Sequence, residues 1–294
     1  LDNTVIVVVS DNGASAEGGL AGSFNELLMG QVDWNDNLRH FDEWGGPKTY
    51  AHYPVGWAAA GNTPFKYYKQ SAHEGGTRVP MIINWPSGIK SGGEIREQFH
   101  HVNDIVPTLL DITGTPAPGL VDGVVQQRLD GISFRYALED ATAPTQKSVQ
   151  YFELWGNHGI WSDGWKAVAL LRPEPWDVFK RLSLDEVQWE LYHVDEDFNE
   201  RIDLASTHSE KLKELQILFE LEAGRNNVFP IAPNPMAVMT AQMQQRLQQR
   251  KGVFLYPAHT SRVPVPLSPP INLFPFEGKA EFSAGSKLEN GVIF

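Results

Sequence analysis

The sequence predicts an α/β protein in which a parallel-sheet part is followed by a small subdomain made of an antiparallel sheet and a helix. Residues 4–9, TVIVVV, are β-branched throughout and do not alternate with polar residues. This pattern is typical of a strand buried on both faces, as in a parallel sheet covered by helices. Residues 151–154, 165–171 and 189–193 alternate instead, which favours antiparallel strands with one solvated face. Two kinds of sheet are therefore expected in succession.

The elements of the first part follow from local signals. Ser23 and Glu26 have capping-box spacing, which predicts a short helix, whereas residues 30–62 are rich in Trp, Gly, Asp and Tyr and are expected to form a long loop. Residues 79–86 predict a short strand bounded by prolines, and residues 104–112 predict a helix closed by Gly114.

The elements of the second part lead to three expected regions. Thr207 and Glu210 have capping-box spacing, and leucines recur every third residue before Gly224, which predicts an amphipathic helix packed on the antiparallel sheet. A further helix is expected from Asn234 to Arg250 and a proline-rich linker from residue 263 to residue 275. The expected regions are residues 1–143 for the α/β part, 144–250 for the α+β subdomain, and 251–294 for a linker into a further region. The leucines are Leu212, Leu215, Leu218 and Leu221.

Composition excludes several classes of partner. The 294 residues carry a formal charge of −12 without a Lys/Arg block, which argues against nucleic acid or an anionic membrane surface. No apolar run approaches the ~18 residues of a membrane helix. The absence of cysteine excludes disulfides and thiolate metal sites within these residues. The opening at Leu1 and the strand-like close at 292–294 lead us to expect a piece of a longer protein.

Asp11 and Asn12 follow the first predicted strand in a Ser-Asp-Asn-Gly sequence. Ligands gather at the carboxyl ends of strands in open α/β sheets. A carboxylate and an amide carbonyl are hard oxygen donors suited to Ca²⁺ or Mg²⁺. An ordinary turn is the competing interpretation, because Asp-Asn-Gly is first of all a turn sequence.

The second candidate feature is a basic, aromatic segment that runs into a Glu-Gly-Gly turn. Lys69 lies five positions ahead of Glu74, and Lys66 lies three residues before Lys69. Either lysine is a candidate for a positively charged group that binds an anion. Solvated lysines and a simple tight turn would explain the same residues. His73 is more often structural than functional in such a loop, and Glu74 and Arg78 are expected to pair with each other.

Together the two features resemble the sulfatase family of the alkaline-phosphatase-like superfamily. The resemblance rests on Ser10-Asp11-Asn12-Gly13 followed by Lys69 and then Glu74-Gly75-Gly76-x-Arg78-x-Pro80. It continues through residues 103–114, 130–134 and 189–205, and residues 151–157 with 163–168 look most similar to large bacterial arylsulfatases. It implies part of an alkaline-phosphatase-like α/β domain in residues 1–143. The similarity to large bacterial arylsulfatases also implies that a further β-rich domain starts within residues 251–294.

The resemblance also implies roles for individual residues. Asp11 and Asn12 match the second half of a Ca²⁺ site, Mg²⁺ being possible, and Lys69 matches a lysine that contacts the sulfate of a small-molecule or carbohydrate sulfate ester. The family's nucleophile is a formylglycine made from a Cys/Ser-x-Pro/Ala-x-Arg motif, which these residues lack, so we expect the isolated chain to be inactive. A phosphonate or phosphate monoester hydrolase and a non-catalytic binding module remain as alternatives. Bacterial cytoplasm and periplasm are both left open.

His100 and His101 are adjacent residues that do not suit one shared metal ion. Neighbouring residues of an extended chain point to opposite faces, so the two rings cannot easily bind one ion. Both are therefore expected to be structural or exposed.

Overall fold

The computed structural model describes residues 1–28, 32–172, 177, 180 and 182–231. These residues belong to one compact unit, Leu1–Pro235. The expected helix up to Arg250, the proline-rich linker and the region 251–294 lie outside the described residues, and the expected boundary between residues 143 and 144 stays a prediction. No helix in the described part of the chain is both long and apolar enough to cross a membrane.

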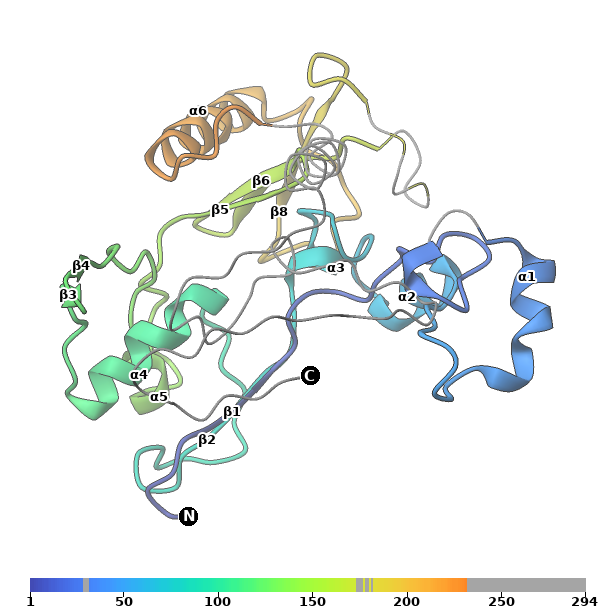
Figure 1. Ribbon diagram of the computed structural model, residues 1–294. Helices are drawn as coiled ribbons and strands as arrows, with labels where there is room; N and C mark the ends of the chain where they lie inside the picture. The colour runs from blue at the N-terminus through green and yellow to red at the C-terminus, as the bar shows by residue number, and fades with distance from the viewer. Residues whose placement is uncertain (29–31, 173–176, 178–179, 181, 232–294) are drawn as a thin grey trace. The chain divides into compact units, whose positions relative to one another are not determined.

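The first strand forms where it is expected but with a different partner. β1, Ile6–Val9, pairs antiparallel with β2, Met81–Asn84, so that Val7 faces Ile83 (Figure 1). Ile6 is 47% exposed and Val8 60%, so burial on both faces within a parallel sheet is wrong for this strand as far as the described residues go. A β-branched run specifies extended backbone, but it does not specify how many neighbours the strand has or in which direction they run.

The segment expected as a long loop contains helices. α1, Trp34–Arg39, begins with a capping box in which Asp33 accepts a hydrogen bond from the backbone of Asp36. The other elements up to the Glu-Gly-Gly turn are η1, Glu26–Leu28; η2, Phe41–Glu43; α2, Val55–Asn62; and α3, Glu74–Thr77. The Ser23 hydroxyl binds the Asn25 carbonyl oxygen instead of capping a helix. Short helices within a polar, Gly-rich segment lack the apolar periodicity that sequence analysis detects.

The helix predicted from residue 104 is confirmed. α4, Ile105–Thr113, follows the short η3, Val102–Asp104, and ends at Gly114 with φ +64°, a left-handed conformation that glycine adopts without penalty. A two-stranded hairpin of β3, Leu120–Val121, and β4, Val124–Val125, and the helix α5, Arg135–Glu139, complete this region.

The antiparallel sheet and its helix are confirmed. The sheet has the strand order β5-β6-β7-β8, with bounds Gln150–Leu154, Asn157–Ser162, Trp165–Ala169 and Trp189–His193. The second of these strands was not predicted, because its sequence NHGIWS does not alternate; five of its six residues are buried. The mixed α/β class and the order of the two parts therefore follow the prediction.

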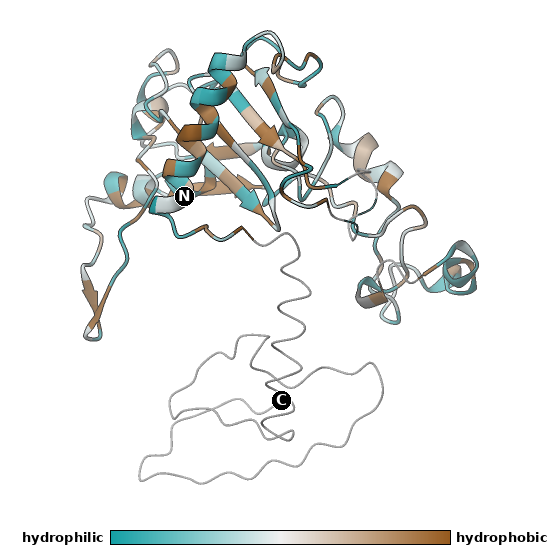
Figure 2. Ribbon diagram, turned by 90° about the horizontal axis from the view of Figure 1, so that it is seen from above, coloured by the Kyte–Doolittle hydropathy of each residue, from teal (hydrophilic) through white to brown (hydrophobic). Residues whose placement is uncertain are grey.

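Helix α6, Ser209–Arg225, packs on this sheet, and three of the four leucines of the predicted stripe take part. Leu215 is buried with Phe219 and Ala223, and Leu212 and Leu218 pack beside them. Leu221 is 54% exposed and lies outside the stripe. Figure 2 shows polar and apolar residues following one another along this helix, with apolar stretches in the neighbouring strands. A spacing of four keeps side chains on one face better than repeated spacings of three, since a turn takes 3.6 residues. The Thr207 hydroxyl binds the Leu204 carbonyl oxygen, so the predicted cap is wrong.

Candidate functional site

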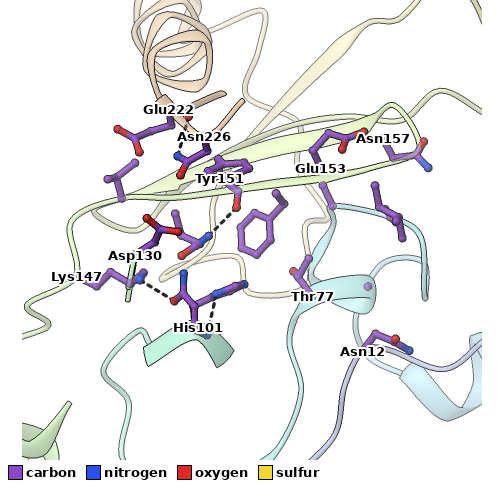
Figure 3. A pocket seen from close by; sticks show the side chains of 18 of the residues that line it. Asn12, Thr77, His101, Asp130, Lys147, Tyr151, Glu153, Asn157, Glu222 and Asn226 are labelled. Carbon is purple, nitrogen blue, oxygen red and sulfur yellow. Dashed lines mark hydrogen bonds between the residues drawn. The ribbon is translucent and has the colours of Figure 1, made fainter. Parts of the chain in front are cut away.

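A cavity of about 510 Å³ brings Asn12 and Lys69 together. Strand β5 forms one wall, and Asn12 lies at one end beyond Thr77 (Figure 3). Asp11 is exposed and precedes the cavity wall. The structure thus places two of the three sequence-predicted site residues on one cavity and the third beside it.

A close backbone approach places Asn12. The amide N–H of Gly13 donates to the carbonyl oxygen of Gly76 at 3.2 Å. A Cβ on Gly13 would lie 1.7 Å from the Gly75 carbonyl oxygen, so no other residue fits this position without moving the backbone. The Asn12 side-chain N–H donates to the Gly13 carbonyl oxygen at 2.8 Å. The side-chain oxygen of Asn12 accepts no hydrogen bond from the residues that the structure describes, and it is the atom that could bind a cation.

Asn62 fastens the strand-end turn to the lysine-bearing loop. Its Oδ1 accepts the Ala14 N–H at 2.9 Å, and its Nδ2 donates to the carbonyl oxygens of Tyr67, at 3.0 Å, and Gly75. The backbone N–H of Lys69 in turn donates to the Ala14 carbonyl oxygen at 3.0 Å. The relative position of Asn12 and Lys69 is therefore fixed by hydrogen bonds between the segments that carry them.

The two candidate lysines have different surroundings. Lys66 Nζ lies 2.6 Å from Glu190 Oε2 and 2.7 Å from Tyr192 Oη, and it does not line the cavity. Lys69 lines the cavity, and its Nζ lies 2.9 Å from Glu17 Oε2. The geometry therefore favours Lys69 over Lys66 as the cation of this site, in agreement with the spacing to the Glu-Gly-Gly turn.

Glu17 is a buried carboxylate that sequence analysis missed. Burial alone raises the pKa of Glu17, but hydrogen bonds from Lys69, Gln70 and Ser15 outweigh it and hold this pKa below its usual value. Glu17 is therefore ionised at neutral pH. A glutamate before two glycines gives no sequence signal of this kind, because its partners are distant along the chain.

His73 is structural. It is fully buried, its Nδ1 lies 2.7 Å from Ser71 Oγ, and its Nε2 lies 3.3 Å from Glu190 Oε2. Burial lowers the pKa of His73 to about 4 even though Glu190 acts in the opposite direction. The ring is neutral at physiological pH and lies outside the cavity lining.

His100 and His101 do not share a binding site, and Glu74 and Arg78 pair with each other, as the sequence predicted. Arg78 lies 3.1 Å from Glu74, as expected. His100 packs on Phe134, whereas His101 lines the cavity and accepts the Asn103 N–H at 3.3 Å. The two neighbouring rings thus have separate environments.

The described residues supply only some of the ligands that a divalent cation needs. Among them, no group of three or more His, Cys, Asp and Glu side chains could hold a metal ion. Asp11 and Asn12 supply two hard oxygen donors, which suits Ca²⁺ or Mg²⁺ but falls short of the six to eight ligands that Ca²⁺ takes.

At the other end of the cavity the positive charge is neutralised. Lys147 Nζ donates to Asp104 Oδ1 at 2.8 Å, and both side chains are buried. Asp104 also accepts the backbone N–H groups of His101 and Ile132. Lys147 and Lys69 are thus both paired with a buried carboxylate, but the Lys69 side chain is 30% exposed whereas that of Lys147 is 6% exposed.

Two family models match this chain and together cover residues 1–226. Residues 1–115 match the family model described as Sulfatase, and residues 65–226 match the model described as N-sulphoglucosamine sulphohydrolase, C-terminal. The second match alone spans more than half of the chain. The chain belongs to the sulfatase family. It is thereby a member of the alkaline-phosphatase-like superfamily and of a family of hydrolases, as the motifs predicted.

Two curated sulfatases show how far the similarity extends. The chain is 31% identical over 235 residues to an uncharacterised sulfatase of Schizosaccharomyces pombe, covering 76% of this chain and 39% of that protein. It is 24% identical over 220 residues to the N-acetylgalactosamine-6-O-sulfatase of Bacteroides thetaiotaomicron, covering 74% of this chain and 36% of that protein. The chain spans less than half the length of these relatives.

Solved structures also align with this sulfatase chain. One, from work on glycosaminoglycan metabolism in Bacteroides thetaiotaomicron, has a TM-score of 0.48 at 20% identity and covers 74% of this chain and 38% of its own. Another, the crystal structure of Ps i-CgsB, has a TM-score of 0.49 at 20% identity and covers 85% and 43% respectively.

Proposed function

We propose that this chain supplies half of a divalent cation site, at Asp11 and Asn12, and a sulfate-binding lysine, Lys69, to the hydrolysis of a sulfate ester. The observation that carries the proposal is that Asn12 and Lys69 line the same cavity. Ca²⁺ suits the two oxygen donors, and Mg²⁺ is the alternative cation.

The charge of the chain makes local cations necessary. With a net charge of −12, the overall field repels an anionic substrate, so binding depends on positive charge placed at the site itself. The Lys69 ammonium binds the sulfate oxygens and stabilises the negative charge that grows on them in the transition state. A bound divalent cation would supply Lewis-acid polarisation of the same oxygens. In this proposal the formylglycine nucleophile comes from residues outside this sequence.

We propose a small-molecule or carbohydrate sulfate ester as the substrate. The cavity volume lies within the range of small-ligand sites, roughly 300–1,000 Å³. Its wall carries Tyr151, Glu153 and Gln150, whose polar groups suit the hydroxyls of a sugar. One curated relative is named as a sulfatase of N-acetylgalactosamine, which supports the carbohydrate class.

A comparison of the two lysines tests the proposal. In the intact protein, Lys69→Gln is expected to lower kcat/KM for an aryl sulfate about 10²–10³-fold, the scale of a lost transition-state donor. Lys66→Gln is the matched control, because it removes a lysine of the same loop that is bound to Glu190. The control is expected to lower thermal stability and to change kcat/KM less than about tenfold. A larger loss of kcat/KM in Lys66→Gln than in Lys69→Gln would reject the assignment.

A further inference from the structure

The backbone around Lys69 is held in an unusual shape. Tyr67 and Gln70, on either side of Lys69, have φ values of 60° and 72°, in the left-handed region that non-glycine residues rarely adopt. Such conformations cost of order 1 kcal/mol each and persist only where surrounding contacts impose them. The backbone that carries Lys69 is therefore held in this shape by tertiary contacts.

Glu17 supplies the contact at the tip of Lys69. Its Oε2 accepts a hydrogen bond from Lys69 Nζ at 2.9 Å, and its Oε1 accepts one from the side chain of Gln70. The Glu17 side chain is 8% exposed, whereas that of Lys69 is 30% exposed. A buried carboxylate thus binds both the ammonium and the neighbouring residue of the lysine loop.

Gln70 connects this carboxylate to the antiparallel sheet. Its side-chain oxygen accepts a hydrogen bond from Arg172 at 2.8 Å, and its backbone carbonyl oxygen accepts one from Asn157 of β6 at 2.7 Å. Through Gln70 the carboxylate is anchored to residues that are far away in the sequence.

A second layer of hydrogen bonds holds Glu17 from behind. The Ser15 hydroxyl donates to Glu17 Oε2 at 2.9 Å, and the same hydroxyl lies 2.8 Å from His52 Nε2. His52 Nδ1 in turn lies 3.2 Å from the backbone nitrogen of Gly18 and 3.2 Å from the carbonyl oxygen of Tyr53. Ser15 therefore donates to Glu17 and is itself held in place by the His52 ring.

We propose that Glu17 is a positioning residue that aims the Lys69 ammonium into the cavity beside Asn12. This inference rests on the proposed function of Lys69 as the sulfate-binding lysine. Glu17 acts through Lys69 and does not itself contact the sulfate, because two anions would repel each other.

The direction in which sulfate affinity changes when Glu17 is neutralised distinguishes a positioning role from simple charge repulsion. A negative charge next to an anion site disfavours anion binding, so neutralising Glu17 on electrostatic grounds alone strengthens sulfate binding. If the main role of Glu17 is to hold Lys69 in place, the same substitution weakens sulfate binding.

Protection of Lys69 from an amine reagent by sulfate tests both the sulfate-binding role of Lys69 and the positioning role of Glu17. The measurement does not require catalytic activity. The intact protein is treated with limiting acetic anhydride over a range of inorganic sulfate concentrations, and acetylation of each lysine is measured by peptide mass spectrometry. In the unchanged protein, sulfate slows acetylation of Lys69 but not of Lys211, which lies on the surface of α6. The half-protecting concentration is the sulfate concentration that halves the rate of Lys69 acetylation. Glu17→Gln is expected to raise it about tenfold, the scale of one lost charge-assisted hydrogen bond.

Two variants serve as controls for the carboxylate. Glu17→Asp keeps the charge with a shorter reach, so its half-protecting concentration lies between those of the unchanged protein and Glu17→Gln. Glu214→Gln removes an exposed carboxylate that is paired with Lys211 and leaves the value unchanged.

Each outcome decides between the proposals. A half-protecting concentration in Glu17→Gln that is equal to or below that of the unchanged protein overturns the positioning role while leaving Lys69 as the sulfate lysine. Absence of sulfate protection at Lys69 in the unchanged protein overturns the proposed function and this inference with it. If Glu17→Gln does not fold, Ser15→Ala takes its place, with a smaller increase expected and no increase counting against the proposal.

Discussion

Lys166 Nζ lies 2.6 Å from Glu74 Oε1, although the two residues are 92 positions apart in the sequence. Lys166, on β7, is 1% exposed and Glu74, at the start of α3, is 6% exposed. This buried ion pair joins the antiparallel sheet to the Glu-Gly-Gly turn that follows Lys69. The sheet therefore takes part in shaping the candidate site.

Breaking this pair is expected to be costly. Lys166→Met leaves the Glu74 carboxylate buried without its main partner and is expected to lower the free energy of unfolding by about 3–5 kcal/mol. Urea denaturation measures the loss. Arg78→Met is the matched control, because Arg78 contacts the same carboxylate but its side chain is 51% exposed, so a loss of about 1 kcal/mol or less is expected. Equal losses in the two variants would contradict a dominant role for the buried pair.

Glu200 makes the stability depend on pH. It is 2% exposed, and its Oε1 has no hydrogen-bond partner among the described residues. Burial raises the pKa of Glu200 to about 7 from 4.5; Lys166 opposes this shift and the Glu74 carboxylate adds to it. Because the folded protein binds the extra proton, this group's contribution to stability is complete below pH 4.5 and is lost as the pH rises to about 7.

Glu200→Gln is expected to remove this loss. The amide oxygen still accepts the Glu74 N–H that Glu200 Oε2 accepts at 2.9 Å, while the buried charge disappears. Urea denaturation at pH 4.5 and pH 8 measures the free energy of unfolding of both proteins. The difference, variant minus unchanged protein, is expected to be about 3 kcal/mol larger at pH 8 than at pH 4.5. His73, whose pKa is lowered to about 4, contributes in the opposite direction, but it is present in both proteins and cancels in the difference. A difference that is the same at both pH values would contradict the assignment.

Asn62 should tolerate no acidic replacement. In Asn62→Asp a carboxylate oxygen takes the place of the N–H donor that faces the carbonyl oxygens of Tyr67 and Gly75. We expect a loss of about 3 kcal/mol in the free energy of unfolding, because two donated hydrogen bonds become acceptor–acceptor contacts. Asn35→Asp, at an exposed position of α1, is the control and is expected to change it by about 0.5 kcal/mol or less. Thermal unfolding of both variants would show the difference, and comparable melting temperatures would refute it.

The core stripe of α6 gives a prediction about packing. Phe219 is 2% exposed and packs among Leu215, Ala223 and the strands, so Phe219→Ala is expected to lower the free energy of unfolding by about 3–5 kcal/mol. Leu221→Ala, at a position 54% exposed, is expected to lower it by about 0.5 kcal/mol or less. Guanidinium denaturation distinguishes the two, and a larger loss for Leu221→Ala would favour the stripe that leucine spacing alone predicts.

The fold class and the family follow from the sequence and are confirmed, whereas the site residues stay predictions. The resemblance to sulfatases favoured Lys69 over Lys66, and in the structure Lys69 lines the same cavity as Asn12 whereas Lys66 does not. The partner of β1 was not predictable, because a β-branched run fixes the extended backbone but not the neighbouring strand.

Residues whose roles depend on contacts with distant parts of the chain could not be predicted from the sequence. Asn62 bonds to a residue 48 positions away, and Glu17 bonds to Lys69 across 52 positions. Neither lies in a local pattern that indicates the contact. Such roles follow from tertiary structure, whereas turn sequences and helix ends follow from local chemistry.

Calorimetric titration of inorganic sulfate into the intact protein, with and without Ca²⁺, tests the central claim that Asn12 and Lys69 serve one sulfate-binding site. The account predicts that Ca²⁺ strengthens sulfate binding, that Asn12→Ala removes most of this dependence on Ca²⁺, and that Lys69→Gln weakens sulfate binding whether or not Ca²⁺ is present. Sulfate binding that is indifferent to Ca²⁺ and to both substitutions would contradict the account.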